Sequence, residues 1–143
     1  MTHSTIARDM LAVLSALQGI GTLAIDLGAK HASNPAWPRH ARFHVVWQSI
    51  GTATLAAVAA VLAVYPGSLQ DRRFYLAALL TAIPMLAFFA ALLGRKLYGG
   101  ALSDPTGIQP AKIQAFGAEL RIDLNLATEA IASLALVFLV ALY

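Results

Sequence analysis

The sequence predicts an all-α fold, an integral membrane four-helix bundle in which residues 1–143 form one domain. Hydrophobic residues make up 59% of the chain and charged residues 12%, whereas soluble domains carry about 25% charged residues. Four apolar stretches, near 6–27, 43–65, 74–93 and 113–143, each reach the length of about 20 residues that a membrane-spanning helix needs. Membrane-spanning strands would show shorter segments of alternating hydrophobicity. We therefore expect four transmembrane helices in up-down-up-down order.

Residues that end helices separate the four segments. Gly28 suits the C-terminal cap of the first helix, and Pro35 disfavours helix in the loop that follows. A Pro-Gly pair at 66–67 ends the second helix, and Pro84 predicts a kink inside the third. The fourth helix is expected to begin after Pro110 and to continue to residue 143.

The first segment and the basic residues predict the localisation. The first segment contains polar residues and lacks a cleavage site of small residues, so we expect a retained span and not a signal peptide. Basic residues are more numerous in the two longer loops (Lys30, Arg39, Arg42, Arg95, Lys96, Lys112) than on the opposite side (Arg8, Arg72, Arg73). The positive-inside rule then places those loops in the cytoplasm and both termini outside a bacterial inner membrane.

Polar side chains form stripes on three of the predicted helices, because residues three or four apart share one helix face. The stripes comprise Ser15, Gln18, Thr22 and Asp26 on the first helix, His40, His44, Gln48 and Thr52 on the second, and Gln114, Arg121, Asn125 and Thr128 with Glu129 at the flank on the fourth. Glu119 and Asp123 share a second face of the fourth helix. In an up-down-up-down bundle, most of these groups gather at one side of the membrane.

Glu129 is the most informative residue of the fourth segment. An ionisable side chain at membrane depth is costly and usually faces a protein interior or a wet cavity. At a helical rise of 1.5 Å per residue, Asp123 would lie at one membrane interface and Glu129 about 9 Å below it. Arg121 and Asn125 would then be its neighbours on the same helix, and we expect His44 and Asp26 to complete one cavity with them.

This predicted cavity would contain the groups that general acid–base catalysis requires. We assign Glu129 as proton donor, Asp26 or Asp123 as the complementary carboxylate, and His44 as proton shuttle. Residues expected to bind or position the substrate, or to form aromatic walls, are Asn125, Arg121, Gln48, Trp47, Thr22 and Trp37. The sequence thus favours a membrane enzyme that isomerises, cyclises or opens an epoxide in a lipophilic small molecule.

Other interpretations of the same residues stay open. The cavity would equally suit a membrane protein that binds or transports a ligand without converting it. Buried charges would also suit an accessory subunit of a membrane complex, or a homodimer. Trp37 and Trp47 have a simpler explanation as interfacial aromatic residues, and the basic residues as topology anchors. Because basic residues beside spans are ordinary topology signals, no nucleic-acid binding is expected.

A metal site has weak support, and no metal or cofactor is predicted. The possible ligands are His31, His40 and His44 with a carboxylate from Asp26, Glu119 or Asp123. The chain has no H-E-x-x-H motif, no Glu-x-x-His pair and no phosphate-binding glycine motif. It also has no cysteine, which excludes disulfides and cysteine-ligated metals.

The loop before the second helix carries a family resemblance. Its sequence, H-A-S-N-P-A-W-P-R-H-A-R-F-H-V-V-W-Q from His31 to Gln48, contains the pattern NPxWPxHxxFHxxWQ. It resembles the signature loop of a family of small uncharacterised four-helix membrane proteins. The architecture is similar to the DoxX-like and EXPERA-like group, and the EXPERA-like proteins include sterol Δ8–Δ7 isomerases. The resemblance implies a cavity for a lipophilic ligand with acids inside the membrane, and it carries over no catalytic residue.

Overall fold

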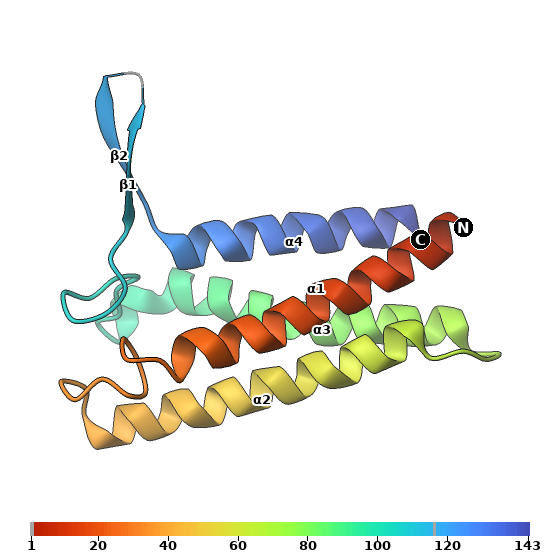
Figure 1. Cartoon of the computed structure of the whole chain (residues 1–143), viewed down its shortest axis with the longest axis horizontal. Coiled ribbons are helices and arrows are strands. Elements are labelled where there is room, and N and C mark those ends of the chain that lie inside the picture. Colours follow the sequence, from red (N-terminus) through yellow and green to blue (C-terminus); the bar gives the residue numbers. More distant parts are fainter. Residues whose placement is uncertain (1, 116) are drawn as a thin grey trace.

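The structure, a computed structural model, describes residues 2–115 and 117–143 and is mostly helical. Its helices are α1 (His3–Asp26), α2 (Arg39–Val64), α3 (Gln70–Gly94) and α4 (Leu124–Leu142), with a short 3-10 helix η1 (Arg95–Leu97) after α3 (Figure 1). All four α-helices are long and apolar enough to cross a membrane. The prediction of four such helices is confirmed.

The prediction that the fourth helix begins after Pro110 is wrong. Strands β1 (Ala111–Ala115) and β2 (Ala118–Ile122) form an antiparallel hairpin there, so the fold is not purely α. Apolar and polar residues alternate along both strands, which is the period of a strand and not of a helix. Gly117, with a φ of 79°, adopts the left-handed conformation that glycine favours in the turn between them. Phe116, inside the segment predicted as helix, lies outside the described residues.

The fourth helix begins only after Asp123. The Asp123 carboxylate accepts a hydrogen bond of 3.0 Å from the backbone N–H of Leu126, which makes Asp123 the N-cap of α4. Glu119 and Arg121 therefore lie on β2 and not on the first turns of a helix. The predicted stripe through Arg121, Asn125 and Thr128 does not form.

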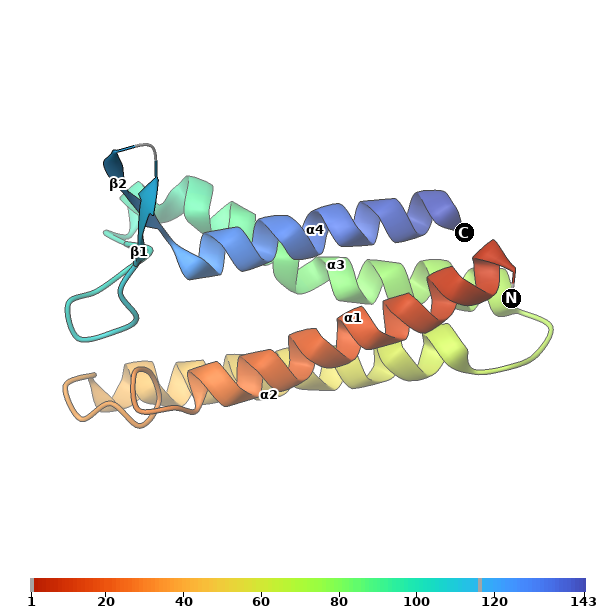
Figure 2. The same cartoon turned by 45° about the horizontal axis from the view of Figure 1, so that its top comes forward.

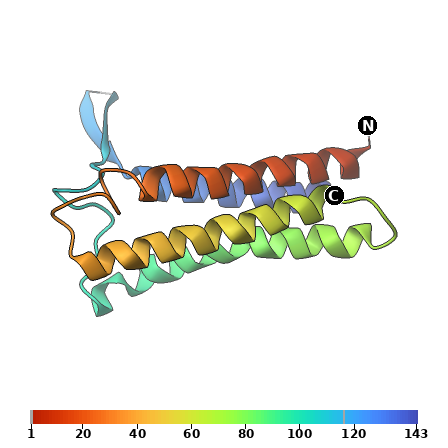
Figure 3. The ribbon, with the colours of Figure 1, turned by 60° about the horizontal axis from the view of Figure 1, so that its bottom comes forward.

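The four helices lie side by side along the longest dimension of the molecule (Figures 1 and 3). Helix α2 packs between α1 and α3, whereas α4 contacts α1 and α3. The chain ends and the α2–α3 connection lie together at one end of the bundle (Figure 2). The α1–α2 loop, the α3–α4 loop and the hairpin lie at the opposite end. This opposite end, residues 27–38 and 95–123, is called the loop end below.

Small residues bring α1 and α2 close together. A Cβ atom added to Gly19 would lie 2.9 Å from the Cβ of Ala56 and 3.4 Å from the Cα of Ala53. Ala56, Ala59 and Ala63 are buried on the same side of α2. This small-residue face of α2, and not its polar stripe, is the face that packs on α1.

Polar contacts tie the helices together at mid-bundle and at the end opposite the loop end. The buried hydroxyls of Ser15 on α1 and Thr81 on α3 are 2.8 Å apart. The Gln18 amide donates to the Thr81 carbonyl at 3.3 Å, three residues before Pro84. The N–H that Pro84 lacks would have bonded the Leu80 carbonyl and not that of Thr81.

At the end that holds the chain termini, Arg8 and Tyr143 make the main polar contacts. Arg8 Nε donates to the Ala63 carbonyl at 2.7 Å, and Nη2 donates to the Tyr65 carbonyl at 3.4 Å. These are carbonyls at the C-terminal end of α2, where a cation is favourable. The Tyr143 ring stacks on buried Phe74 with centroids 3.8 Å apart.

Candidate functional site

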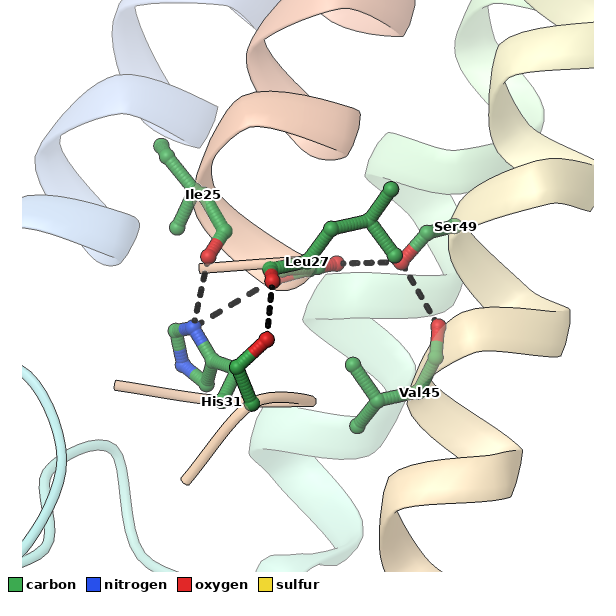
Figure 4. A network of polar contacts seen from close by, with 7 residues as sticks. Ile25, Leu27, His31, Val45 and Ser49 are labelled. Atoms are coloured by element: carbon green, nitrogen blue, oxygen red, sulfur yellow. Dashed lines mark hydrogen bonds and ion pairs between the residues drawn. The ribbon is translucent and has the colours of Figure 1, made fainter. Parts of the chain in front are cut away.

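Asp26, the last residue of α1, is the centre of a polar cluster at the loop end. Figure 4 shows its partners His31 and Ser49. One carboxylate oxygen lies 3.1 Å from the hydroxyl of buried Ser49, whose single hydrogen is shared between Asp26 and the Val45 carbonyl at 2.6 Å. The other carboxylate oxygen lies 3.8 Å from Nδ1 of His31. The same Nδ1 is 3.2 Å from the Ile25 carbonyl, which orients the imidazole.

The cluster includes one of the two tryptophans expected at the site. The Trp37 ring meets the His31 ring edge to face, with centroids 5.3 Å apart. Two predicted site residues, Asp26 and Trp37, are therefore connected through His31. Ser49, the partner of Asp26, lies on none of the predicted polar stripes. The available signal was its place on the small-residue face of α2, seven residues before Ala56.

Asn34 has a structural role in the loop that follows. Its side chain is buried, donates to the Thr106 carbonyl at 2.9 Å, and accepts from the Ala36 N–H at 3.0 Å. The first bond joins the α1–α2 loop to the α3–α4 loop, and the second closes an Asx turn. In that second loop, Asp104 forms a similar turn by accepting from the Thr106 N–H at 2.8 Å.

The polar and aromatic stripe at the start of α2 faces outward. His40 and His44 have their Nε2 atoms 3.0 Å apart, and both side chains are exposed. Gln48 is exposed as well, and Trp47 keeps 64% of its surface exposed. Because the small-residue face of α2 packs on α1, the stripe lies away from the bundle interior. The predicted meeting of His44, Gln48 and Trp47 with Glu129 is not found among the contacts of residues 2–115 and 117–143.

Glu129 is partly buried on α4. Its Oε2 atom is buried and has no hydrogen-bond partner within the part of the chain that the structure describes. The same holds for Ser133 Oγ, one turn further on, and for Oε1 of Gln18 on α1. Arg121, expected as a partner, instead pairs with Glu119 on the hairpin, with its Nε 3.2 Å from the Glu119 carboxylate.

A cavity of about 190 Å³ lies at the loop end between the end of α3 and the start of α4. Its polar side chains include Arg95 and Asn125, and Asn125 is a predicted binding residue. Apolar side chains such as Phe88, Leu92 and Leu102 form much of the remaining wall. Arg95 is not among the binding residues that the sequence predicts, although its position at the end of an apolar helix indicates an interfacial role.

The other predicted residues are placed as follows. Thr22 is partly buried on α1, one turn before Asp26. Asp123 is occupied as the N-cap of α4. The four residues assigned to catalysis therefore lie at separate places: Asp26 at the α1–α2 corner, His44 on the outer face of α2, Asp123 at the hairpin–α4 junction and Glu129 partly buried in the second turn of α4.

Metal-ligating residues do not gather into a larger group. Over the two ranges that the structure describes, no group of three or more His, Cys, Asp or Glu side chains could hold a metal ion. His40 and His44 form a pair, and His31 adjoins Asp26.

No protein-family model, curated protein or solved structure matches this chain. The resemblance to DoxX-like and EXPERA-like proteins therefore stays a prediction.

Proposed function

We propose that this chain is an integral membrane protein whose helices cross the bilayer in up-down-up-down order and which binds a lipophilic small molecule with an anionic head at the loop end. The outer face of α4 supports the membrane setting. Ile131, Leu134, Val137 and Phe138 each expose 64–71% of their surface. A continuous apolar face of this kind suits lipid and not water.

The cavity between α3 and α4 carries the binding proposal. Its combination of the Arg95 guanidinium, the Asn125 amide and apolar walls is what an amphiphile needs at a membrane interface. One guanidinium N–H donates to the Leu92 carbonyl at 2.7 Å, and an arginine has four further N–H donors for an anion. At about 190 Å³, the cavity would hold a head group and not a whole ligand, so the apolar tail would lie along α3 and α4 in the bilayer.

A photoreactive fatty acid tests this proposal. The probe is oleate carrying a diazirine and an alkyne, added to the protein in lipid nanodiscs and displaced by unlabelled oleate. Arg95→Gln should weaken binding about tenfold or more, because a charge-assisted hydrogen bond contributes about 1.5–3 kcal/mol. Lys96→Gln is the matched control, since Lys96 is the exposed next residue and does not line the cavity.

The outcomes of this experiment are distinct. Cross-links at residues that line the cavity, lost in Arg95→Gln and kept in Lys96→Gln, support the proposal. Equal losses in both variants would mean that the probe responds only to surface charge. Saturable binding that neither variant changes would place the fatty acid elsewhere.

An acid–base enzyme is a second proposal, supported by the Asp26–His31 pair. A carboxylate fixed by Ser49 and adjoining an imidazole is suitable equipment for proton transfer. The test is to incubate the reconstituted protein with a membrane lipid extract and compare its products by mass spectrometry. Products that depend on the wild-type protein and disappear in Asp26→Asn, but persist in Gln48→Ala, would support catalysis at this pair. Identical profiles for wild type and Asp26→Asn would refute it.

A further inference from the structure

The hairpin of β1 and β2 has one charged face and one apolar face. Its register pairs Lys112 with Arg121 and Gln114 with Glu119, and residues opposite each other in a hairpin share a face. Lys112 Nζ and Arg121 Nε lie 3.6 Å and 3.2 Å from the Glu119 carboxylate, which fixes this as the charged face. The same register places Ile113 opposite Leu120, and the alternation of side chains puts these two on the other face.

The apolar face of the hairpin is uncovered. Ile113, Leu120 and Ile122 expose 46%, 47% and 37% of their surface. A two-stranded hairpin in water is marginally stable at best, and it gains stability when one face packs on something apolar. The bundle does not supply that cover, so the apolar face is expected to contact another phase or another molecule.

The direction of the hairpin indicates what its apolar face contacts. The strands run across the helix axes and not along them, and they extend beyond α4 on the side away from α2 (Figures 1 and 2). Asp123 alone separates β2 from α4. If α4 crosses the bilayer, the strands lie along the membrane surface at the depth where α4 enters it, above lipid and not above protein.

We propose that the hairpin of residues 111–122 is a membrane-surface anchor. Ile113 and Leu120 insert among the acyl chains beside α4, and the charged face of the hairpin faces the phosphates and water. Two basic residues against one acidic residue give that face a cationic excess that suits anionic lipids. The inference rests on the membrane insertion proposed above, and it is independent of which ligand the cavity holds.

Single cysteine variants test the anchor cleanly, because the chain has no cysteine of its own. Ile113→Cys and Leu120→Cys report on the apolar face, and Gln114→Cys is the matched control on the charged face. Leu134→Cys, on the exposed side of α4, reports on membrane insertion itself. Each variant carries an environment-sensitive fluorophore and is reconstituted into vesicles of phosphatidylcholine and phosphatidylglycerol.

Two quenchers then locate each fluorophore. A lipid with a nitroxide near its head group should quench positions 113 and 120 several-fold more than position 114, and aqueous iodide should show the reverse order. Position 134 should be quenched by a nitroxide deep in the acyl chain. In vesicles of phosphatidylcholine alone, lipid quenching at positions 113 and 120 should be weaker than in the mixed vesicles, because the anionic head groups that attract the hairpin are absent.

Failure of the anchor and failure of insertion give different results. Accessibility of position 134 to iodide would overturn membrane insertion and with it the proposed function. Lipid quenching at 134 together with equal iodide quenching at 113, 114 and 120 would overturn the anchor alone. Shielding of 113 and 120 from both quenchers would show that protein, such as a second copy of the chain, covers this face, and would also overturn the lipid anchor.

Discussion

Gly19→Ala tests the close approach of α1 and α2. The added Cβ would lie 2.9 Å from the Cβ of Ala56, whereas carbon atoms in favourable contact are about 3.5–4.0 Å apart. The two helices would therefore have to separate by roughly 0.6–1 Å at this level. Overpacking of this kind costs about 1–3 kcal/mol, so we expect the free energy of unfolding to fall by that amount.

Titration with SDS in mixed micelles measures this change. Gly21→Ala is the matched control, because a Cβ on Gly21 would meet no atom within 4 Å. That control should be neutral or stabilise by up to about 1 kcal/mol, the difference in helix propensity between Gly and Ala. Ala56→Gly in the Gly19→Ala background removes the nearest atom and should restore most of the loss. If Gly19→Ala unfolds at the same SDS fraction as Gly21→Ala, the deduced helix contact is wrong.

Three further predictions concern polar contacts. Ser15→Ala and Thr81→Val each remove the bond between their hydroxyls and should each destabilise by about 0.5–1.5 kcal/mol in the same titration, with the double variant losing less than the sum. Asn34→Ala removes the bond between the two long loops, so limited proteolysis should cut residues 27–38 faster than in the wild type; equal rates would contradict this role. Hydrogen bonds from Thr106 hold the pKa of Asp104 below its usual 3.8. The turn should therefore be fully stable above pH 3.8 and loosen only as pH falls through that lower pKa, which hydrogen exchange at the Thr106 amide would detect.

The number of helices was predictable because length and apolarity alone decide which segments suit a bilayer. The hairpin was missed because its residues precede α4 without a proline or a long loop, so the apolar run was extended backward through them. The strict alternation from Ala111 to Ala115 and from Ala118 to Ile122 was visible in the sequence. Counting how many positions match the strand period and how many match the helix period would have separated the hairpin from α4.

The predicted site failed for a different physical reason. A helical wheel shows which residues share a face, and the rise per residue shows their depth, but neither shows which face packs inward. On α2 the small residues decide this, since they allow α1 to approach, and the stripe through His44 and Gln48 is left outside. Asp26 and Asn125 do line polar features of the loop end, whereas Glu129 is partly buried on α4 with one carboxylate oxygen shielded from solvent.

If the helices cross a membrane as proposed, the contacts of Arg8 also bear on how the orientation of the protein could be engineered. Moving basic residues from one side of a span to the other is a direct way to invert a membrane protein. Removal of Arg8 would also take a cation away from the last carbonyls of α2, so an inverted variant would be destabilised at the same time. Lys30, which is exposed at the loop end, is a position where charge can be changed to alter insertion while the helix contacts stay intact.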